Sequence, residues 1–407
     1  MPDSASLDSG CLHLSSAVPP NIRRLLENPT SEQQRQGYFD TLREICQQPA
    51  TLLATCECMC DAASALNAML SGTRSLTLTG SGSSEYAGEC VRLALQANLG
   101  RTVQTVGSGT ILTHGTNAIG AERPALVISL ARSGDSPESV GAVSLLLDKD
   151  PAIRHLILTC NSNGKLAQAF RGDPRVLVIV LDERTNDRSL VMTSSFTSLV
   201  VAARFVGLSN SLDRYRSLNF RLSRLLTGLM ERHLGALAGI AVIGFQRAVF
   251  LGSGPRFGSA REAALKMLEM TAGAVSTLPE TYLGLRHGPM SYVHDDSLIV
   301  CFLSSAPTVR AYETDLIREL NRKQLGLAKL IVGDGIARDL LTERDFAIEC
   351  PGLCEIGDEN APVLDVVVGQ LLAFFRCLEQ GLRPDAPSES GVINRVVESF
   401  ELHRAEK

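Results

Sequence analysis

Two glycine- and serine-rich turns contain the first residues of this chain that could do chemistry. Gly80-Ser81-Gly82-Ser83-Ser84 follows the apolar run Leu76 to Thr79 and precedes a helical pattern. Arg132-Ser133-Gly134-Asp135-Ser136 follows the apolar run Ala125 to Leu130 in the same way. Such turns direct backbone N–H groups, hydroxyls and the positive end of a helix dipole to one point, which suits a phosphate. If both strands belong to one parallel sheet, the two turns lie side by side and could bind the same phosphate.

Other interpretations of these turns are a plain helix cap and a nucleotide site. Glycine- and serine-rich turns cap helices in many α/β proteins without binding a ligand, so neither turn is decisive alone. The glycine spacing disfavours a dinucleotide, because Ser83 and Ser84 follow Gly82 and precede Ala87 and Gly88. No Gly-Lys-Ser or Gly-Lys-Thr occurs, which disfavours a nucleoside triphosphate.

A second group of reactive side chains lies in the other half of the chain. Glu262, Lys266 and Glu269 are spaced by four and three residues, so they project from one face of a helix. A solvated face with ion pairs explains this spacing equally well. Downstream, residues 278–291 form a stretch punctuated by glycine and proline that contains His287, and we expect a loop there. Loops of this kind carry functional sites more often than core residues do.

The composition bounds the classes of protein to consider. The 407 residues suffice for two ordinary domains, and 44% hydrophobic with 20% charged residues are globular values. A net charge of -5 gives no basic surface of the kind that nucleic-acid binding requires. No apolar run is long enough to cross a membrane, and the first residues lack the pattern of a secretory signal. We therefore expect a cytoplasmic enzyme or sensor.

Eleven cysteines raise the alternatives of disulfides and a metal site. An odd count in a long chain without an export signal favours reduced thiols. Cys56, Cys58 and Cys60 fall on a helix predicted from about residue 50 to 69, where Cys56 and Cys60 share a face and Cys58 points away. We expect these cysteines to be small packing residues and expect no metal site.

The first half of the chain must position the serine-rich turns. Residues 1–30 are rich in serine and proline, and we expect this segment to be mobile. Helices are predicted over 31–48 and 50–69. From Ser75 onward, short apolar runs alternate with amphipathic stretches, which is typical of βαβ units. The pattern predicts an α/β domain over residues 31–215, with a parallel sheet covered on both faces.

The second half repeats this order of elements. A helix predicted over 212–241 leads into Arg247 to Leu251, then Gly252-Ser253-Gly254 and another helical pattern. Further strands are predicted at 298–303 and 330–332. The separation of the two copies indicates a duplicated domain rather than a short repeat, so a second domain is expected over 216–407. Its other turn, Ser304-Ser305-Ala306-Pro307, lacks the Ser-Gly-Asp-Ser pattern, so we expect one phosphate site per chain, in the first copy.

Together these motifs resemble the tandem sugar isomerase (SIS) domain proteins. The nearest resemblance is to the galactosamine-6-phosphate deaminase/isomerase family, also named tagatose-6-phosphate ketose/aldose isomerases, and it runs from about residue 30 to residue 400. The resemblance implies two tandem SIS domains, each a parallel sheet flanked by helices in an αβα sandwich. The segments that carry it are 80–84, 129–136, 192–197, 262–269, 280–289 and 394–397.

Similarity to the isomerase half of glucosamine-6-phosphate synthase implies roles for single residues. Glu269 matches the carboxylate that transfers a proton, Lys266 its neighbouring lysine, and His287 the histidine that opens the sugar ring. In that family the histidine reaches a neighbouring subunit, so a homodimer or a dimer of dimers is implied. No metal or redox cofactor is implied. The residues implied to contact the 6-phosphate sugar are Ser83, Ser84, Arg132, Ser133, Ser136 and Glu262.

The chain departs from that relative at three places. Ala-Arg-Ser-Gly-Asp-Ser replaces Ser-Gln-Ser-Gly-Glu-Thr, which puts the fixed cation Arg132 beside the phosphate. Met1-Pro2 replaces an N-terminal nucleophilic cysteine and no glutaminase segment is present, so we do not expect ammonia to come from glutamine. Where the relative has a lysine that can form a Schiff base with a ketose, the closest match in this chain is Arg395. A guanidinium cannot lose its proton to do so, and we expect Arg395 to bind substrate instead.

The expected activity is conversion of an aminosugar 6-phosphate to a ketose 6-phosphate and ammonia. Ketose/aldose isomerisation without deamination is the nearest alternative, and a non-catalytic sugar-phosphate sensor is another. The presence of Glu269, Lys266 and His287 favours an enzyme over the sensor. The sequence leaves open whether the sugar has the galacto or the gluco configuration.

Overall fold

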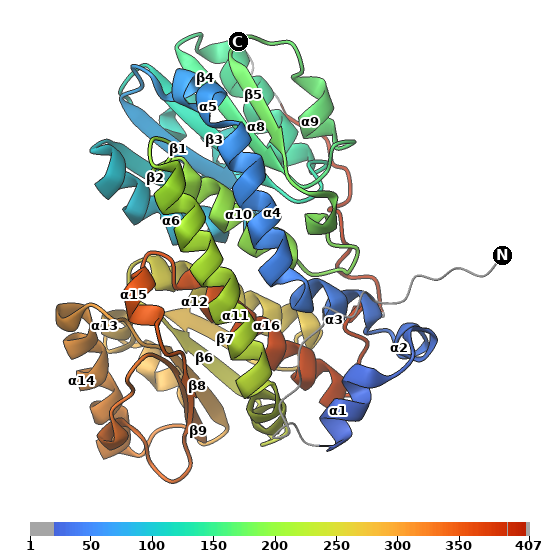
Figure 1. The fold of residues 1–407 in the computed structure, drawn as a ribbon, viewed down its shortest axis with the longest axis vertical. Helices are drawn as coiled ribbons and strands as arrows, with labels where there is room; N and C mark the ends of the chain where they lie inside the picture. The colour runs from blue at the N-terminus through green and yellow to red at the C-terminus, as the bar shows by residue number, and fades with distance from the viewer. Residues whose placement is uncertain (1–19, 389, 404–407) are drawn as a thin grey trace.

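Two α/β lobes stacked one above the other form the molecule (Figure 1). The computed structural model describes residues 20–388 and 390–403. The upper lobe has a five-stranded parallel sheet in the order β2-β1-β3-β4-β5. Its strands are β1 (Ser75–Gly80), β2 (Thr102–Gly107), β3 (Ala125–Ala131), β4 (Ile153–Thr159) and β5 (Val176–Val180). The predicted α/β class, with a parallel sheet in each half, is confirmed.

The lower lobe repeats the topology of the upper lobe. Its parallel sheet has the order β10-β9-β8-β6-β7, so β6 takes the place of β1 and β7 that of β2. The turns after β1 and β6 also match, because Gly82 has φ 56° and ψ -124° and Gly254 has φ 55° and ψ -125°. The strands are β6 (Arg247–Leu251), β7 (Ser276–Glu280), β8 (Ser297–Phe302), β9 (Ala328–Gly333) and β10 (Phe346–Glu349).

Helices flank both sheets and also join the two lobes. In the junction, α6 packs on α12, α12 on α16, and α11 on both α16 and α4. One apolar core runs without interruption through these helices and both lobes. The helices of the upper lobe are α6 (Ser83–Leu99), α7 (Ser108–His114), α8 (Pro137–Lys149), α9 (Lys165–Ala169) and α10 (Ser194–Phe205). Those of the lower lobe are α11 (Leu212–Ala241), α12 (Pro255–Met270), α13 (Tyr282–Leu285), α14 (Pro307–Lys323), α15 (Leu353–Ile356) and α16 (Pro362–Glu379).

Burial explains why the central strands contain only apolar or small side chains. Every residue of β1 and β3 is buried, whereas the outer strands β2 and β5 are partly exposed. Strands with both faces covered need apolar or small side chains throughout. None of the described helices is both long and apolar enough to span a membrane.

The described N-terminal residues are more helical than predicted. Of the segment expected to be mobile, residues 1–19 lie outside the described residues, and α1 occupies Pro20–Glu27. Each of the two predicted helices is divided in two. Gly37, in a left-handed conformation, separates the halves of the helix predicted over 31–48, and Ala62 separates those of the helix predicted over 50–69. The four helices are α2 (Thr30–Gln36), α3 (Phe39–Cys46), α4 (Gln48–Asp61) and α5 (Ala63–Leu70).

Two further differences concern the lower lobe and the cysteines. The segment predicted as a loop at 278–291 begins inside the edge strand β7 and then forms α13, and β10 was not predicted. On α4, Cys56 and Cys60 are buried in the core, while the half-buried Cys58 thiol faces the carbonyl oxygen of Val180 at 3.4 Å. These contacts agree with a packing role.

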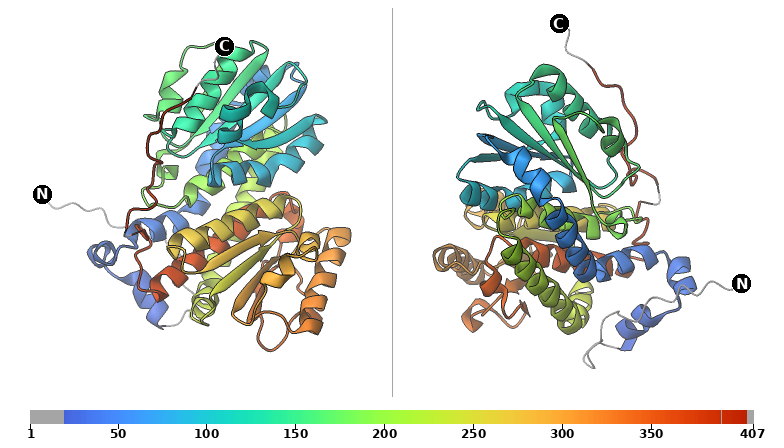
Figure 2. Two further views of the ribbon diagram at one scale, coloured as in Figure 1. Left: turned by 180° about the vertical axis from the view of Figure 1, so that it is seen from behind. Right: turned by 45° about the horizontal axis from the view of Figure 1, so that its top comes forward.

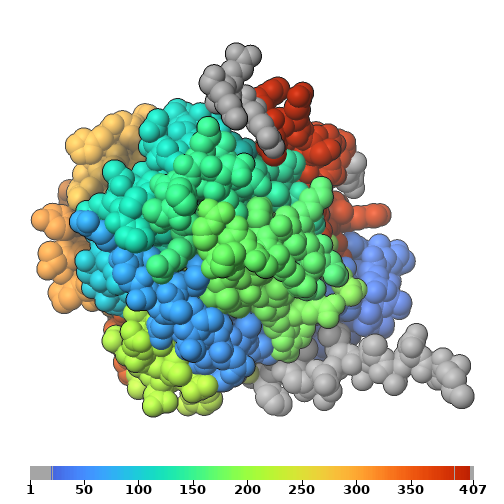
Figure 3. Space-filling view, turned by 90° about the horizontal axis from the view of Figure 1, so that it is seen from above, coloured from blue at the N-terminus to red at the C-terminus, as the bar shows by residue number. Residues whose placement is uncertain are grey.

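After α16 the chain runs back to the upper lobe as a tail without helix or strand, here called the C-terminal tail (residues 386–388 and 390–403). Figure 2 shows the tail, in dark red, leaving the lower lobe and climbing along one side of the upper lobe. Seen from above, red atoms of the tail lie on the surface beside the upper lobe (Figure 3). Residues 393–397 of the tail line the same hollow of the surface as the serine-rich turns.

Candidate active site

A cleft of about 410 Å³ lies at the carboxyl ends of β1 and β3. These two strands are neighbours in the sheet, with Thr79 opposite Ser129, so the two serine-rich turns lie side by side as predicted. This position, where the strand order reverses, is the usual place for a ligand in an open parallel sheet. The predicted site residues that line the cleft are Ser83, Ser84, Arg132, Ser133, Ser136, Lys266, Glu269 and Arg395.

Glycine shapes the first turn. A β-carbon on Gly80 would lie 2.7 Å from the backbone carbonyl carbon of Ser84, so no larger residue fits there without a shift. The positive φ of Gly82 then turns the chain into α6. As a result, the first residues of the helix, Ser83 and Ser84, are buried with their side chains on the wall of the cleft.

Arg132 is a buried cation that has no carboxylate partner within the described residues. Its guanidinium donates to the backbone carbonyls of Ser189 at 3.4 Å, Leu190 at 3.0 Å, and Arg395. Burial and the nearby Arg395 lower the pKa of Arg132 from its usual value. Because neutral carbonyls compensate a full charge poorly, an anion in the cleft would gain directly from this guanidinium.

The loop that holds Arg132 is itself fixed by two buried carboxylates that we did not predict. Glu44 on α3 accepts from the backbone N–H of Arg188 at 2.5 Å and from the hydroxyl of Ser189. Asp187 accepts from the backbone N–H groups of Thr193 and Ser195, both at 2.8 Å. Burial, and then the charge of Asp187, raise the pKa of Glu44 to about 7.

The C-terminal tail contributes a second arginine. Arg395 donates from Nε to the carbonyl of Asp187 and from Nη2 to the side-chain oxygen of Asn186, both at 2.7 Å. Like Arg132, it makes no ion pair with a carboxylate in residues 20–388 and 390–403. Two guanidinium groups thus face one cleft without a carboxylate on either, which makes the cleft electrostatically suited to an anion.

Helix α12, which supplies another part of the cleft wall, carries the charged trio Glu262, Lys266 and Glu269. Lys266 forms ion pairs with Glu269 and, at 3.3 Å, with Glu262. Glu262 and Lys266 are fully buried, whereas the Glu269 side chain retains 23% exposure and lines the cleft. These three residues therefore do not form the solvated surface that was the other interpretation. Lys266 also donates to the hydroxyl of Ser83 at 3.1 Å, which connects the α12 residues to the first serine-rich turn.

Titration of this cluster is set by its burial. Burial, opposed by Lys266 and assisted by Glu269, raises the pKa of Glu262 to about 7. Burial also disfavours the charge on Lys266, but its two carboxylate partners outweigh that effect and raise its pKa. Lys266 consequently remains an ammonium group at neutral pH. Of the two carboxylates in this trio, only that of Glu269 lines the cleft, beside the ammonium group of Lys266.

His287 is exposed and does not line the cleft of its own chain. It follows α13 in the lower lobe, where its backbone N–H donates to the carbonyl of Gly284 at 2.9 Å. Glu262 also lies outside the cleft lining and touches it through Lys266. The structure brings eight of the ten predicted residues to the cleft and leaves these two outside it.

The matching turn of the lower lobe is filled by its own side chains. Arg256 occupies the position of Ser84, is fully buried, and donates from Nε to Asp365 at 2.9 Å. It also donates to the carbonyl of Leu303 at the end of β8. This internal ion pair gives a physical reason for the expectation that the phosphate site lies in the upper lobe.

Comparison with known proteins adds close relatives over nearly the whole length. No model of a known protein family matches the chain. A candidate D-galactosamine-6-phosphate deaminase AgaS of Streptomyces coelicolor is 37% identical over 373 residues, which are 89% of this chain and 95% of that protein. The D-galactosamine-6-phosphate deaminase AgaS of Escherichia coli is 34% identical over 330 residues, 81% of this chain and 85% of that protein.

The fold is likewise similar to a solved structure. A candidate tagatose-6-phosphate ketose/aldose isomerase of Clostridium novyi superposes with a TM-score of 0.87 at 30% sequence identity. The match covers 93% of this chain and 99% of that one, so it includes both lobes.

Proposed function

The chain belongs to the SIS-domain family of proteins named D-galactosamine-6-phosphate deaminase AgaS, and we propose that it converts an aminosugar 6-phosphate to a ketose 6-phosphate and ammonia. The observation that carries this proposal is the placement of Glu269 and Lys266 in the same cleft as the serine-rich turns and Arg132. A phosphate-binding end and an acid-base end thus share one cleft.

The 6-phosphate of the substrate binds at the serine-rich turns. Hydroxyls of Ser83, Ser84, Ser133 and Ser136 and the N-terminus of α6 donate to its oxygens, and Arg132 supplies the compensating charge. Arg395 orients or neutralises the sugar from the tail side. It stays protonated and forms no imine with the product.

Proton transfer takes place at the α12 wall. With the ring open, Glu269 removes the proton from C2 of the aldose and returns it to C1, which converts the enolamine to a 2-imine. Water then hydrolyses the imine and releases ammonia. Lys266, held as an ammonium by Glu262, steadies the Glu269 carboxylate and the charge that develops on the substrate.

Ring opening is assigned to His287 of a neighbouring subunit. The exposed position of this histidine, outside the cleft of its own chain, supports action in a second copy. Mixing a Glu269→Gln chain with a His287→Ala chain should restore part of the activity, because one hybrid site then has both residues intact. Demonstrably mixed dimers that stay as inactive as the two parents would contradict this assignment.

Plain ketose/aldose isomerisation is the second candidate, supported by the name of the Clostridium novyi relative. The two candidates differ in one product. Purified chain is supplied with galactosamine-6-phosphate or glucosamine-6-phosphate, without glutamine, and ammonia and ketose 6-phosphate are measured together. Equal amounts of both products from either sugar support deamination. If the chain interconverts tagatose 6-phosphate with its aldose but releases no ammonia from either aminosugar, the activity is isomerisation and not deamination.

A further inference from the structure

The C-terminal tail is hydrogen-bonded to the upper lobe through one residue. Residues 393–397 line the substrate cleft, yet among the described residues every hydrogen bond between the tail and the upper lobe involves Arg395. The carbonyl of Arg395 accepts from Arg132. Its guanidinium donates from Nε to the carbonyl of Asp187 and from Nη2 to Oδ1 of Asn186, both at 2.7 Å. The position of the tail at the cleft therefore depends on these three bonds.

Asn186 contacts Arg395 from outside the substrate cleft. It lines a neighbouring hollow of about 840 Å³, which shares Arg395 with the cleft, and it does not line the cleft itself. Its backbone is held in place, because its N–H donates to the carbonyl of Glu183 at 3.0 Å. The next residue, Asp187, binds the backbone at the start of α10 through its carboxylate. Asn186 can therefore affect a ligand in the cleft only through Arg395.

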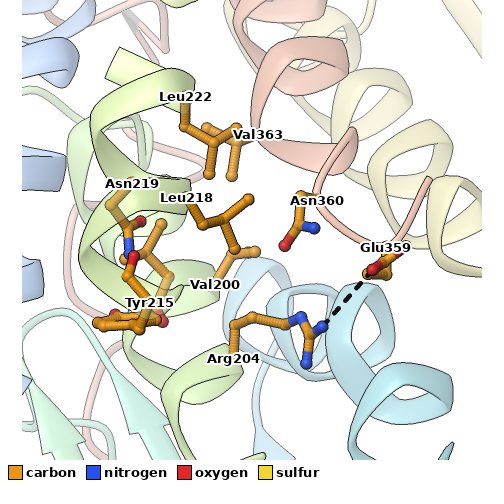
Figure 4. A pocket seen from close by; sticks show the side chains of 10 residues that line it. Val200, Arg204, Tyr215, Leu218, Asn219, Leu222, Glu359, Asn360 and Val363 are labelled. Carbon is orange, nitrogen blue, oxygen red and sulfur yellow. Dashed lines mark hydrogen bonds and ion pairs between the residues drawn. The ribbon is translucent and has the colours of Figure 1, made fainter. Parts of the chain in front are cut away.

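The acceptor that Asn186 offers is neutral. At the junction of the lobes, by contrast, Arg204 extends toward the carboxylate of Glu359, 3.8 Å away (Figure 4). Arg395 makes no such ion pair in the described part of the chain, because Asp187 turns its carboxylate to α10 and offers only its carbonyl. A neutral acceptor holds a guanidinium in place and leaves its charge available to an anion.

We propose that Asn186 is a positioning residue, which holds Arg395 and the tail at the cleft while leaving the guanidinium charge available to the phosphorylated substrate. This inference rests on the proposed function, in which Arg395 binds that substrate. Two substitutions separate the position of Arg395 from its charge. Asn186→Leu keeps a side chain of similar size and removes the acceptor. Asn186→Asp keeps the acceptor and adds a negative charge that neutralises the guanidinium.

Attachment of the tail is measured in the full chain by tryptic cleavage after Arg395, quantified by mass spectrometry. Asn186→Leu removes one of the three bonds and should speed this cleavage at least about threefold, because cleavage follows the population of detached tail. Asn186→Asp strengthens the remaining contact and should not speed it. The matched control is Asn98→Asp, the same change at an exposed position of α6 outside both hollows, and it should be cleaved like the parent.

Substrate binding is measured by calorimetry in chains that also carry Glu269→Gln, so that no turnover occurs. The ligand is galactosamine 6-phosphate or glucosamine 6-phosphate, whichever the Glu269→Gln chain binds more tightly. Asn186→Leu and Asn186→Asp should each weaken binding at least about fivefold, the first through lost position and the second through lost charge. Asn98→Asp should leave binding unchanged. Once Arg395→Ala is present, neither change at Asn186 should weaken binding further, because the side chain through which it acts is gone.

The inference is overturned if Asn186→Asp binds the aminosugar phosphate as tightly as the chain with Asn186 intact. It is also overturned if either change at Asn186 weakens binding as much with Arg395→Ala as without it, or if Asn186→Leu is cleaved after Arg395 at the rate of the parent. The proposed role of Arg395 in substrate binding fails separately, if Arg395→Ala alone leaves the affinity unchanged.

Discussion

The two lobes treat an arginine at the end of their sheet in opposite ways. In the lower lobe, Arg256 is neutralised directly by Asp365, and both side chains are fully buried. In the upper lobe, Arg132 is bonded to backbone carbonyls, and the nearest buried carboxylates hold the loop rather than the arginine. The same topology therefore supports a closed structural ion pair in one copy and an uncompensated cation in the other.

This difference teaches where the duplicated fold can bind a ligand. A directly paired arginine has no electrostatic capacity left for an anion, whereas Arg132 retains most of its own. Ser84 keeps the first turn open with a small hydroxyl, whereas Arg256 fills the equivalent space with the largest fully buried side chain of the described residues. The glycines that shape the two turns are alike and do not decide the outcome.

The largest predicted effect comes from breaking the closed pair. Arg256→Ala should lower the free energy of unfolding by about 3–5 kcal/mol, because it leaves Asp365 buried and unpaired. The double change Arg256→Met with Asp365→Leu should be far milder, since no buried charge remains. Urea denaturation followed by circular dichroism compares the two. A single variant as stable as the double variant would mean that the pair is not the element that closes this turn.

The buried carboxylate of the open lobe should make stability depend on pH. The pKa of Glu44 is raised from 4.5 to about 7 by burial and by Asp187, so the folded state binds the proton more tightly. The stability that Glu44 contributes is thus fully present below about pH 4.5 and is lost as pH rises toward 7. In Glu44→Gln this fall should be shallower by about 1 kcal/mol per pH unit, measured by urea denaturation across the range. Glu57→Gln, an exposed carboxylate change on α4, should keep the parent slope.

A smaller effect is expected from removing one donor of the open turn. Arg132→Ala or Ser133→Ala should weaken binding of a sugar 6-phosphate by about 1.5–3 kcal/mol, through loss of a charge-assisted hydrogen bond. Ser305→Ala in the equivalent turn of the lower lobe is the matched control and should bind like the parent. If calorimetry shows that all three variants bind the sugar 6-phosphate with the affinity of the parent, the phosphate does not bind in this cleft.

Much of the architecture could be predicted because its signals are local. The alternation of apolar and amphipathic runs predicted the central strands, and the repeated Gly-Ser-Gly turn predicted the duplicated domain. The edge strand β7 was missed because Ser276–Glu280 contains proline and polar residues, which an edge position tolerates and a central one does not. The breaks at Gly37 and Ala62 were missed because the helical pattern continues on both sides.

The residues around the candidate site could be predicted less completely than the fold, and for a different reason. Motif residues on the strand ends and on α12 carry recognisable spacing, and the structure gathers them in one cleft. Glu44 lies on an amphipathic helix beside partly exposed acids and bases. Nothing local marks its contact with residues 188–189, about 140 positions away.

The central claim is that the open lobe binds the substrate and that Glu269 moves its proton. Steady-state kinetics of ammonia release by Glu269→Gln, beside the parent chain, test it most directly, because glutamine keeps the shape of the side chain but not the base. We predict that kcat falls at least about 10²-fold while KM for the aminosugar 6-phosphate changes little. A variant that releases ammonia with the kcat of the parent would contradict the account.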